Sequence, residues 1–520
     1  MKRCPQCRRD YYDETLLYCL DDGNALLEGP SSAEDIPTAL IPRSADRDLR
    51  GVEPPLTSVA VLPFVHLSKD PDDEYFCDGM SEELTNALAR MDDLKVVART
   101  SSFAFKGRSV PVSEIGSSLN VHHVVEGSVQ KFGDRMRITV QLVNTSDGYH
   151  LWSEKFDTQL RDLFDVQDEI TKSVVGTLRS KLLGDSEHRG ALVDVTTPDL
   201  KERDVDAYQH YLRGRYFLNR FTPDDFLKAI ESFKAALEID RNFAPAYAAI
   251  SEAHVSLTEF GPIPPLEGLP RAKEAALKAI ELDPQLSEAH GSLALVLQEY
   301  DFNFADAEKH YRIAISLNPN NAIAHEYYGS LLAQLGRPRE AKEQCRKAIE
   351  LDPLSPIGGW FYPMALYLEL RFDEAIREAD RVRGLDPNFS PEHLILSFIY
   401  EALGERDKSA NSFLRFLELC GMQEFADESR EAYKTGGWEG YLRAMTSVEA
   451  RSHLPAYFVA ANYVNLGDHD AALWALEDSY ARREGMVVLV NTDPRLDPLR
   501  SELRFKDLIK KIGFPKPDIL

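Results

Sequence analysis

Three cysteines fall within the first nineteen residues, and their spacing is typical of a metal site. Cys4 and Cys7 are separated by two residues, so they can present two thiolates to one ion, and Cys19 follows after eleven further residues. A structural zinc site takes four ligands, and Asp22 lies where a second such pair would place its cysteine. The sequence therefore predicts a zinc site formed by Cys4, Cys7, Cys19 and Asp22. The alternative is a head without metal whose thiols are free.

This head, residues 1–28, resembles the short zinc ribbons that open many multidomain bacterial proteins, which usually carry two complete cysteine pairs. The resemblance implies a small hairpin held by the ion, because so short a segment has no other means of folding. Residues 29–57 are rich in Pro, Ser, Asp and Arg without an apolar period, and are predicted to be a flexible linker. The head would then be a separate unit.

A second set of candidate residues follows the second predicted strand of the next segment. These are basic and hydroxyl side chains, the types that bind anions: Arg99, Ser101, Ser102, Lys106 and Arg108. In open α/β sheets, ligands bind beyond the carboxyl ends of the strands, so a small anion such as a nucleotide is one candidate ligand. No glycine-rich phosphate loop accompanies them. The alternative, loop residues that form hydrogen bonds within the protein, therefore stays open.

Catalytic motifs are absent from the sequence. It has no GxGxxG, GxxxxGK[ST], HExxH or GxSxG motif and no kinase HRD or DFG. The chain is therefore not expected to be an enzyme. His290 and His325 are 35 residues apart, at equivalent positions of a repeat described below, and are interpreted as packing residues. Cys77, Cys345 and Cys420 are interpreted as inert thiols.

The elements that would position the anion site lie in residues 58–185. Runs of β-branched residues and of alternating apolar and polar residues predict strands at Ser58–Leu67, Leu94–Ala98, His122–Lys131, Arg135–Asn144 and Tyr149–Phe156. Helical spacing of apolar residues predicts helices at Gly79–Met91, Val112–Leu119 and Leu160–Leu183. We expect one α/β domain.

This segment resembles the TolB amino-terminal-like, or FlgO-like, domain that often precedes tetratricopeptide repeats in bacterial signalling proteins. The resemblance covers most of the segment, on Ser58–Phe64, Glu74–Gly79, Ala98–Phe103, Val125–Val129 and Leu151–Glu154. In that family the domain usually follows an effector, such as a winged-helix domain, a class III nucleotide cyclase or a serine/threonine kinase. This sequence shows no such effector, so cyclase or kinase activity is not carried over.

From residue 204 onward, strand signals vanish and a short phrase ending in proline recurs. Pro284, Pro319, Pro353 and Pro387 are 35, 34 and 34 residues apart. This period is the signature of the tetratricopeptide repeat, in which pairs of antiparallel helices stack into a solenoid. In the best unit, 322–353, Gly329 allows close helix packing. We expect a linker at 186–203, about seven units over 204–520 with the later ones diverged, and a loop inserted at 261–270.

Composition narrows the choice of partner and compartment. The formal net charge of −25 and pI of about 5.0 disfavour nucleic acid and anionic membranes. No apolar run approaches the ~20 residues of a spanning helix, and the amino terminus lacks the apolar core of a secretory signal. The sequence therefore predicts a soluble cytoplasmic protein, and the family resemblances imply a bacterial one.

Two functions from different classes follow. A repeat solenoid offers a groove for an extended or helical peptide, which favours a non-catalytic intracellular scaffold or signalling protein that binds a protein partner. In the alternative, the α/β domain binds a small anionic ligand as a sensor or enzyme, and the repeats target it. The oligomeric state is not indicated.

Overall fold

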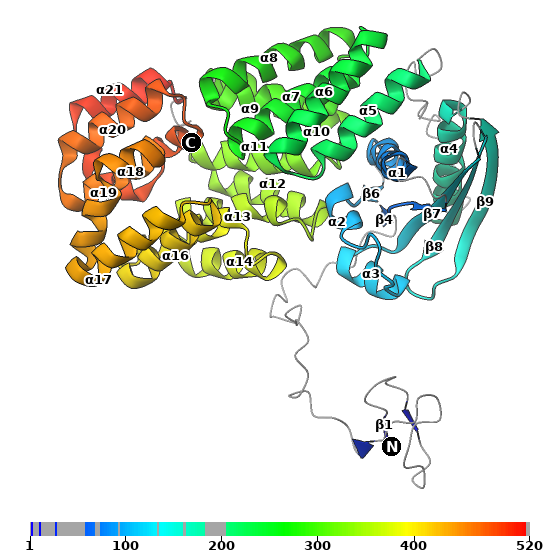
Figure 1. The fold of residues 1–520 in the computed structure, drawn as a ribbon, viewed down its shortest axis with the longest axis horizontal. Coiled ribbons are helices and arrows are strands. Elements are labelled where there is room, and N and C mark those ends of the chain that lie inside the picture. Colours follow the sequence, from blue (N-terminus) through cyan, green and yellow to red (C-terminus); the bar gives the residue numbers. More distant parts are fainter. Residues whose placement is uncertain are drawn as a thin grey trace. The chain divides into compact units, whose positions relative to one another are not determined.

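The computed structural model describes residues 58–67, 73–91, 94–132, 135–159, 163–182 and 204–515, together with three two-residue strands near the amino terminus (Figure 1). The chain divides into two compact units, residues 1–52 and 53–520. Within the described residues, no helix combines the length and the apolar character needed to cross a membrane.

The first unit contains a small antiparallel sheet. Its central strand β1 (Lys2–Arg3) pairs with β2 (Asp10–Tyr11) and β3 (Leu27–Glu28). The four predicted zinc ligands, Cys4, Cys7, Cys19 and Asp22, lie outside the described residues, as does the linker 29–57. The zinc site therefore stays a prediction.

The second unit begins with a mixed sheet in the order β6-β4-β7-β8-β9, with β5 also paired to β7. The strands are β4 (Ser58–Val61), β5 (Val65–His66), β6 (Lys95–Val96), β7 (His123–Phe132), β8 (Arg135–Asn144) and β9 (His150–Gln159). β4, β5 and β6 run parallel to their partners, and β7 to β9 are antiparallel. The predicted strand Ser58–Leu67 is divided into β4 and β5 around Pro63, which has no N–H to donate to a ladder.

Helices cover both faces of this sheet. α1 (Asp73–Ala89) and α4 (Leu163–Leu182) pack on the face that carries Val59 and Val61, and α3 (Val112–Leu119) packs on the opposite face. A short helix, α2 (Arg99–Phe103), was not predicted. α1 begins six residues before the predicted start at Gly79. This glycine lies inside the helix and serves close packing, since a Cβ there would lie 2.6 Å from the side chain of Leu212.

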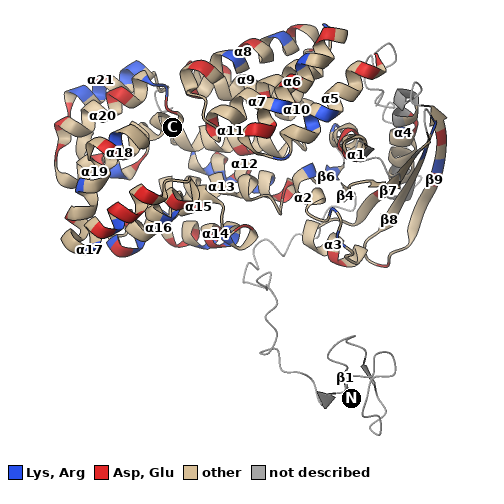
Figure 2. Ribbon diagram, viewed as in Figure 1, with Lys and Arg blue, Asp and Glu red and all other residues tan. Residues whose placement is uncertain are grey.

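Between residues 204 and 515, the chain forms six successive helix pairs. They are α5 (Val205–Leu218) with α6 (Pro223–Ile239), α7 (Ala244–Glu259) with α8 (Pro265–Leu282), α9 (Ser287–Glu299) with α10 (Phe304–Leu317), α11 (Ala322–Gln334) with α12 (Pro338–Leu351), α13 (Pro356–Leu368) with α14 (Phe372–Leu385), and α15 (Ser390–Ala402) with α16 (Arg406–Leu419). A Cβ at Gly329 would lie 2.6 Å from the sulfur of Cys345, as expected for close packing within a pair. Asp and Glu are distributed along these helices with Lys and Arg between them (Figure 2).

Two regions differ from the predicted repeat frame. The insertion 261–270, predicted to be a loop, contains the start of α8, because Pro265 occupies the first helical position, where a missing N–H costs nothing. After the sixth pair, α17 (Gln423–Met445) is kinked at Gly437, whose φ is 60°. It is followed by α18 (Val448–His453), a further pair, α19 (Ala456–Leu466) with α20 (His469–Ala481), two 3-10 segments, η3 (Gly485–Asn491) and η4 (Pro494–Leu499), and α21 (Leu503–Ile512).

Candidate functional site

The first helices of successive pairs pack against one another and form the inner face of the repeats. The chain's own η3–η4 segment covers the downstream part of this face. Asp493, fully buried, accepts hydrogen bonds from the hydroxyls of Tyr367 in α13 (2.8 Å) and Tyr457 in α19 (2.7 Å). Arg495 binds Asp493 at 2.6 Å and stacks 3.5 Å above the ring of Phe398 in α15. Residues of the chain itself therefore occupy this part of the predicted peptide groove.

At the upstream end, α1 packs against α5 through buried ion pairs. Glu82, in α1, lies 2.5 Å from Arg215 of α5 and accepts a 2.9 Å hydrogen bond from Asn219. Arg99 approaches the same carboxylate at 3.2 Å, and Arg215 also binds Glu252 of α7 at 2.8 Å. Burial opposes ionisation of Glu82, but the two guanidinium groups hold its pKa below the usual value. These contacts tie the α/β domain to the first two helix pairs.

The turns between helix pairs form a second contact with the α/β domain. Asp352, in the repeated Leu-Asp-Pro phrase, accepts hydrogen bonds from the backbone N–H (3.0 Å) and hydroxyl (2.5 Å) of Ser101. In the preceding inter-repeat turn, the side chain of Asn320 accepts from the N–H of Val96 (3.1 Å) and donates to the carbonyls of Ala89, at the end of α1, and Leu94, just before β6 (2.9 Å each). The polar residues of two inter-repeat turns thus dock the sheet edge and α2.

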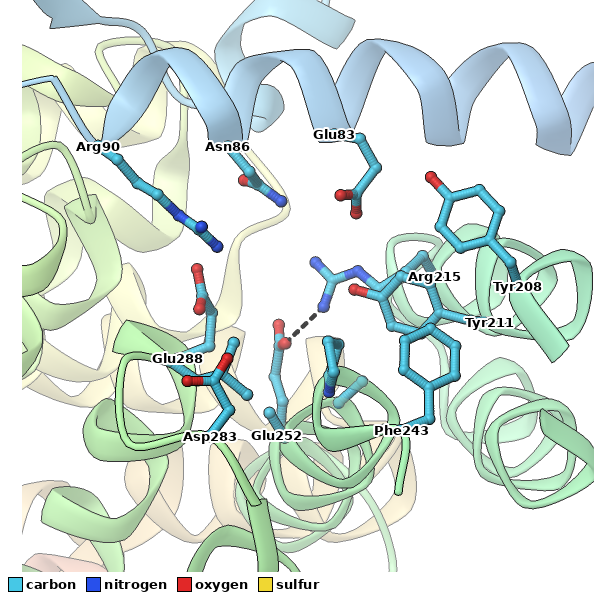
Figure 3. Close-up of a pocket in the computed structure, with 14 residues that line it drawn as sticks. Glu83, Asn86, Arg90, Tyr208, Tyr211, Arg215, Phe243, Glu252, Asp283 and Glu288 are labelled. Carbon is cyan, nitrogen blue, oxygen red and sulfur yellow. Dashed lines mark hydrogen bonds and ion pairs between the residues drawn. The ribbon is translucent and has the colours of Figure 1, made fainter. Parts of the chain in front are cut away.

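An open pocket of about 100 Å³ remains on the inner face between α1 and the first helices of three pairs (Figure 3). Glu83, Asn86 and Arg90 project into it from α1. Arg215 and Glu252 face them from α5 and α7, together with Glu288 from α9. One wall is aromatic, because Tyr211 lies against Tyr208 and Phe243 with ring centroids 6.1 and 5.0 Å apart. The pocket has the size of one side chain.

Carboxylates outnumber cations in this pocket. Its charged lining consists of Glu83, Glu252, Asp283 and Glu288 against Arg90 and Arg215. Arg215 is already bound by Glu82 and Glu252, and Arg90 is exposed without an ion pair among the described residues. Burial, reinforced by the neighbouring Glu82, raises the pKa of Glu83 to about 7. The arrangement can hold one additional cation between these carboxylates.

The structure separates the residues of the predicted anion site into two groups. Arg99 is paired with Glu82 of α1 and Ser101 with Asp352 of the repeats, and the buried hydroxyl of Ser102 has no hydrogen-bond partner among the described residues. Lys106 and Arg108 line a different space, a cavity of about 600 Å³ over β7 and β8. Ligand binding by these residues stays a prediction.

Sequence reasoning did not find the acidic pocket, because its residues come from α1 and from repeats more than a hundred residues away. It also assigned His290 and His325 only to packing. The Nε2 atoms of His290, His325 and His393 each lie 3.1–3.2 Å from the carbonyl of the proline six residues earlier. This recurring Pro-to-His spacing is visible in the sequence, and it could have predicted these contacts between histidine rings and proline carbonyls.

Comparison with known proteins gives two family matches. The family described as "HilA/YgeH-like transcriptional regulator, second domain" matches residues 56–173, where the TolB-like or FlgO-like domain was expected, and that finer resemblance stays a prediction. The family "Tetratricopeptide repeat" matches residues 328–353. The predicted repeats are thereby confirmed.

Relatives named for different activities share parts of the chain. The protein named "Putative adenylate cyclase 3" of Rhizobium meliloti is 36% identical over 250 residues, which cover 47% of this chain and 40% of that protein. "Transcriptional regulator HilA" of Salmonella typhimurium is 22% identical over 378 residues, 71% of this chain and 65% of that protein. The match thus spans less than two thirds of either relative.

A solved structure, titled "Functional Characterization of Pseudomonas Aeruginosa pilF", is 22% identical with a TM-score of 0.32, over 43% of this chain and 97% of that one. The two family matches place a HilA-like second domain ahead of tetratricopeptide repeats in this chain.

Proposed function

We propose that this chain is a non-catalytic regulatory protein of the bacterial cytoplasm that binds a protein partner through its repeats. The partner would insert a Lys or Arg side chain into the pocket between α1, α5, α7 and α9. The observation that carries the proposal is the pocket itself: four carboxylates and an aromatic wall around a space of about 100 Å³ on the open part of the inner face.

The charge of the whole chain favours a basic partner. Its net charge of −25 attracts a basic segment over distances longer than a contact and speeds the encounter. At the pocket, Glu83 and Glu288 come from different elements, so a cation between them would bridge α1 and the repeats. The partner would thereby strengthen the contact that the buried Glu82–Arg215 pair already makes.

The names of the relatives support a regulatory role rather than one particular chemistry. One is named for an adenylate cyclase and the other for a transcriptional regulator, although both match parts of this chain. A module common to two such different activities is suited to binding and control. The same reasoning supports the expectation that this chain is not itself an enzyme.

A peptide-binding measurement tests the proposal. Fluorescent peptides with a single Lys or Arg in a neutral background would be titrated with the full chain, followed by anisotropy. Binding is expected for the basic peptides and not for matched Gln peptides. Glu288→Arg should reduce it at least tenfold, whereas Glu274→Arg, the same change on an exposed position of α8, should not. Equal binding of the Gln peptides would refute the proposal.

A further inference from the structure

A second cavity lies within the α/β domain, away from the repeat pocket. Its volume is about 600 Å³, within the range of sites for small organic ligands. The floor is the polar part of the sheet, where Glu126 and Ser128 of β7 lie beside Thr139 and Gln141 of β8. The wall is the connection from α2 to α3, and one end is closed by α1 at the carboxyl end of β4, where ligands of open α/β sheets bind.

Asp78 of α1 lines this end of the cavity, and one of its carboxylate oxygens has no hydrogen-bond partner among the described residues. Its side chain is only 5% exposed, and its Oδ2 accepts a 2.7 Å hydrogen bond from Lys106, which also binds Glu74. Its Oδ1 is buried and has no hydrogen-bond partner in the described structure. A buried carboxylate oxygen without a donor is costly, so this atom points to a donor supplied from outside the chain.

The charges around the cavity disfavour a multiply charged anion. Three carboxylates, Glu74, Asp78 and Glu126, oppose two cations, Lys106 and Arg108. Lys106 is already held by two of the carboxylates, and Arg108 is exposed at the rim. A nucleoside triphosphate would therefore meet more repulsion than attraction, contrary to the anionic ligand predicted from the sequence.

The opposite wall is apolar. Phe105, Val110 and Val112 pack partly buried against the core under α3, together with the buried Ile115, and all four line the cavity. A ligand that satisfies both sides carries a nitrogen donor at one end and an apolar body at the other. We infer that this cavity binds a small organic amine, whose ammonium or N–H group donates to Asp78 Oδ1 while its body lies against these four side chains.

Calorimetry on the full chain with 2-phenylethylamine and its isostere 2-phenylethanol tests the inference. Because so small a ligand has few atoms, a Kd on the order of millimolar is expected for the amine, with the alcohol at least tenfold weaker. Asp78→Asn should weaken the amine roughly tenfold or more, because the bond to a charged acceptor is lost. Asp157→Asn, an exposed change on β9, is the matched control.

A second variant keeps the test decisive if Asp78→Asn fails to fold. Ser128→Phe, on a half-buried position of the floor, fills the cavity without touching the ion pairs and should abolish amine binding. The inference is overturned if the amine does not bind, if the alcohol binds equally well, or if amine binding survives Ser128→Phe. Binding of AMP that Ser128→Phe abolishes, in the absence of amine binding, would also overturn it and restore the anionic ligand.

Discussion

Asp352 and Ser101 are 251 residues apart in the sequence, yet one carboxylate oxygen of Asp352 accepts two hydrogen bonds from Ser101. The hydroxyl of Ser101 also accepts the N–H of Leu354 at 2.8 Å, so this serine is donor and acceptor in the same contact. Burial raises the pKa of Asp352 to about 6, although the serine bonds oppose the rise. The Leu-Asp-Pro sequence that ends this repeat therefore also binds the HilA-like domain.

Replacing Ser101 should lower the stability of the second unit, residues 53–520. Ser101→Ala leaves a buried carboxylate short of a donor, and we expect a loss of about 1–3 kcal/mol in the free energy of unfolding. Urea denaturation followed by tryptophan fluorescence measures it. Ser117→Ala, which removes an exposed hydroxyl from α3, should change stability little. An equal effect of both variants would show that the Ser101–Asp352 contact is not stabilising.

Breaking the ion pairs between α1 and α5 should lower stability more than Ser101→Ala does. Arg215→Met would leave Glu82 and Glu252 without their shared cation, and breaking a buried pair from one side costs about 3–5 kcal/mol. Arg213→Met, on the exposed side of the same helix, is the control. The thermal unfolding temperature should decrease for Arg215→Met and not for Arg213→Met. If Arg215→Met unfolds at the wild-type temperature, α1 does not depend on this network.

Two adjacent histidines predict a pH dependence of stability. The Nδ1 atoms of His290 and His310 are 2.8 Å apart, and burial lowers the pKa of both. The folded state therefore favours the neutral rings, so stability should fall as pH drops below about 6.5, the unfolded value, until the folded pKa values are passed. The next repeat has Gln344 at the position of His310, bound to His325. His310→Gln should fold and show a smaller loss between pH 7 and pH 5 in urea titrations; an unchanged pH profile would contradict this assignment.

Glu392 predicts that stability decreases as pH rises, the opposite of the histidine effect. It is fully buried in α15, both of its carboxylate oxygens lack hydrogen-bond partners among the described residues, and burial raises its pKa to about 9. A raised carboxyl pKa means that stability is present at low pH and is lost as pH rises from about 4.5 towards 9. Glu392→Gln should therefore stabilise the chain more at pH 8 than at pH 5. An equal effect at both pH values would mean that the pKa of this carboxyl group is the same in the folded and the unfolded chain.

Much of the fold could be predicted, because local patterns determine it. The proline period located the repeats, and the alternation in Arg135–Asn144 matches β8. The close contact of Gly79 with Leu212 and the filling of the inner face by η3–η4 could not be predicted, since they depend on segments far apart in the sequence. For the same reason, the candidate anion residues divided between an internal contact and a cavity.

Binding of a basic partner should itself depend on pH. Because the pKa of Glu83 is raised to about 7, its carboxyl group is half protonated near neutrality and attracts a cation less. Affinity for a Lys or Arg peptide should increase between pH 6 and pH 8, and Glu83→Gln should flatten that increase while weakening binding at pH 8. Anisotropy titrations at several pH values measure it. A steeper dependence in Glu83→Gln would exclude this residue as the cause.

Photo-crosslinking from the exposed edge of the pocket tests the central claim most directly. A benzoylphenylalanine at Arg90, an exposed residue that lines the pocket, would be compared in living cells with one at Glu274 on the exposed side of α8. The account predicts that the probe at Arg90 alone captures a partner, through a segment that contains Lys or Arg. Capture only from Glu274, or capture at Arg90 through a segment without a basic residue, would contradict it.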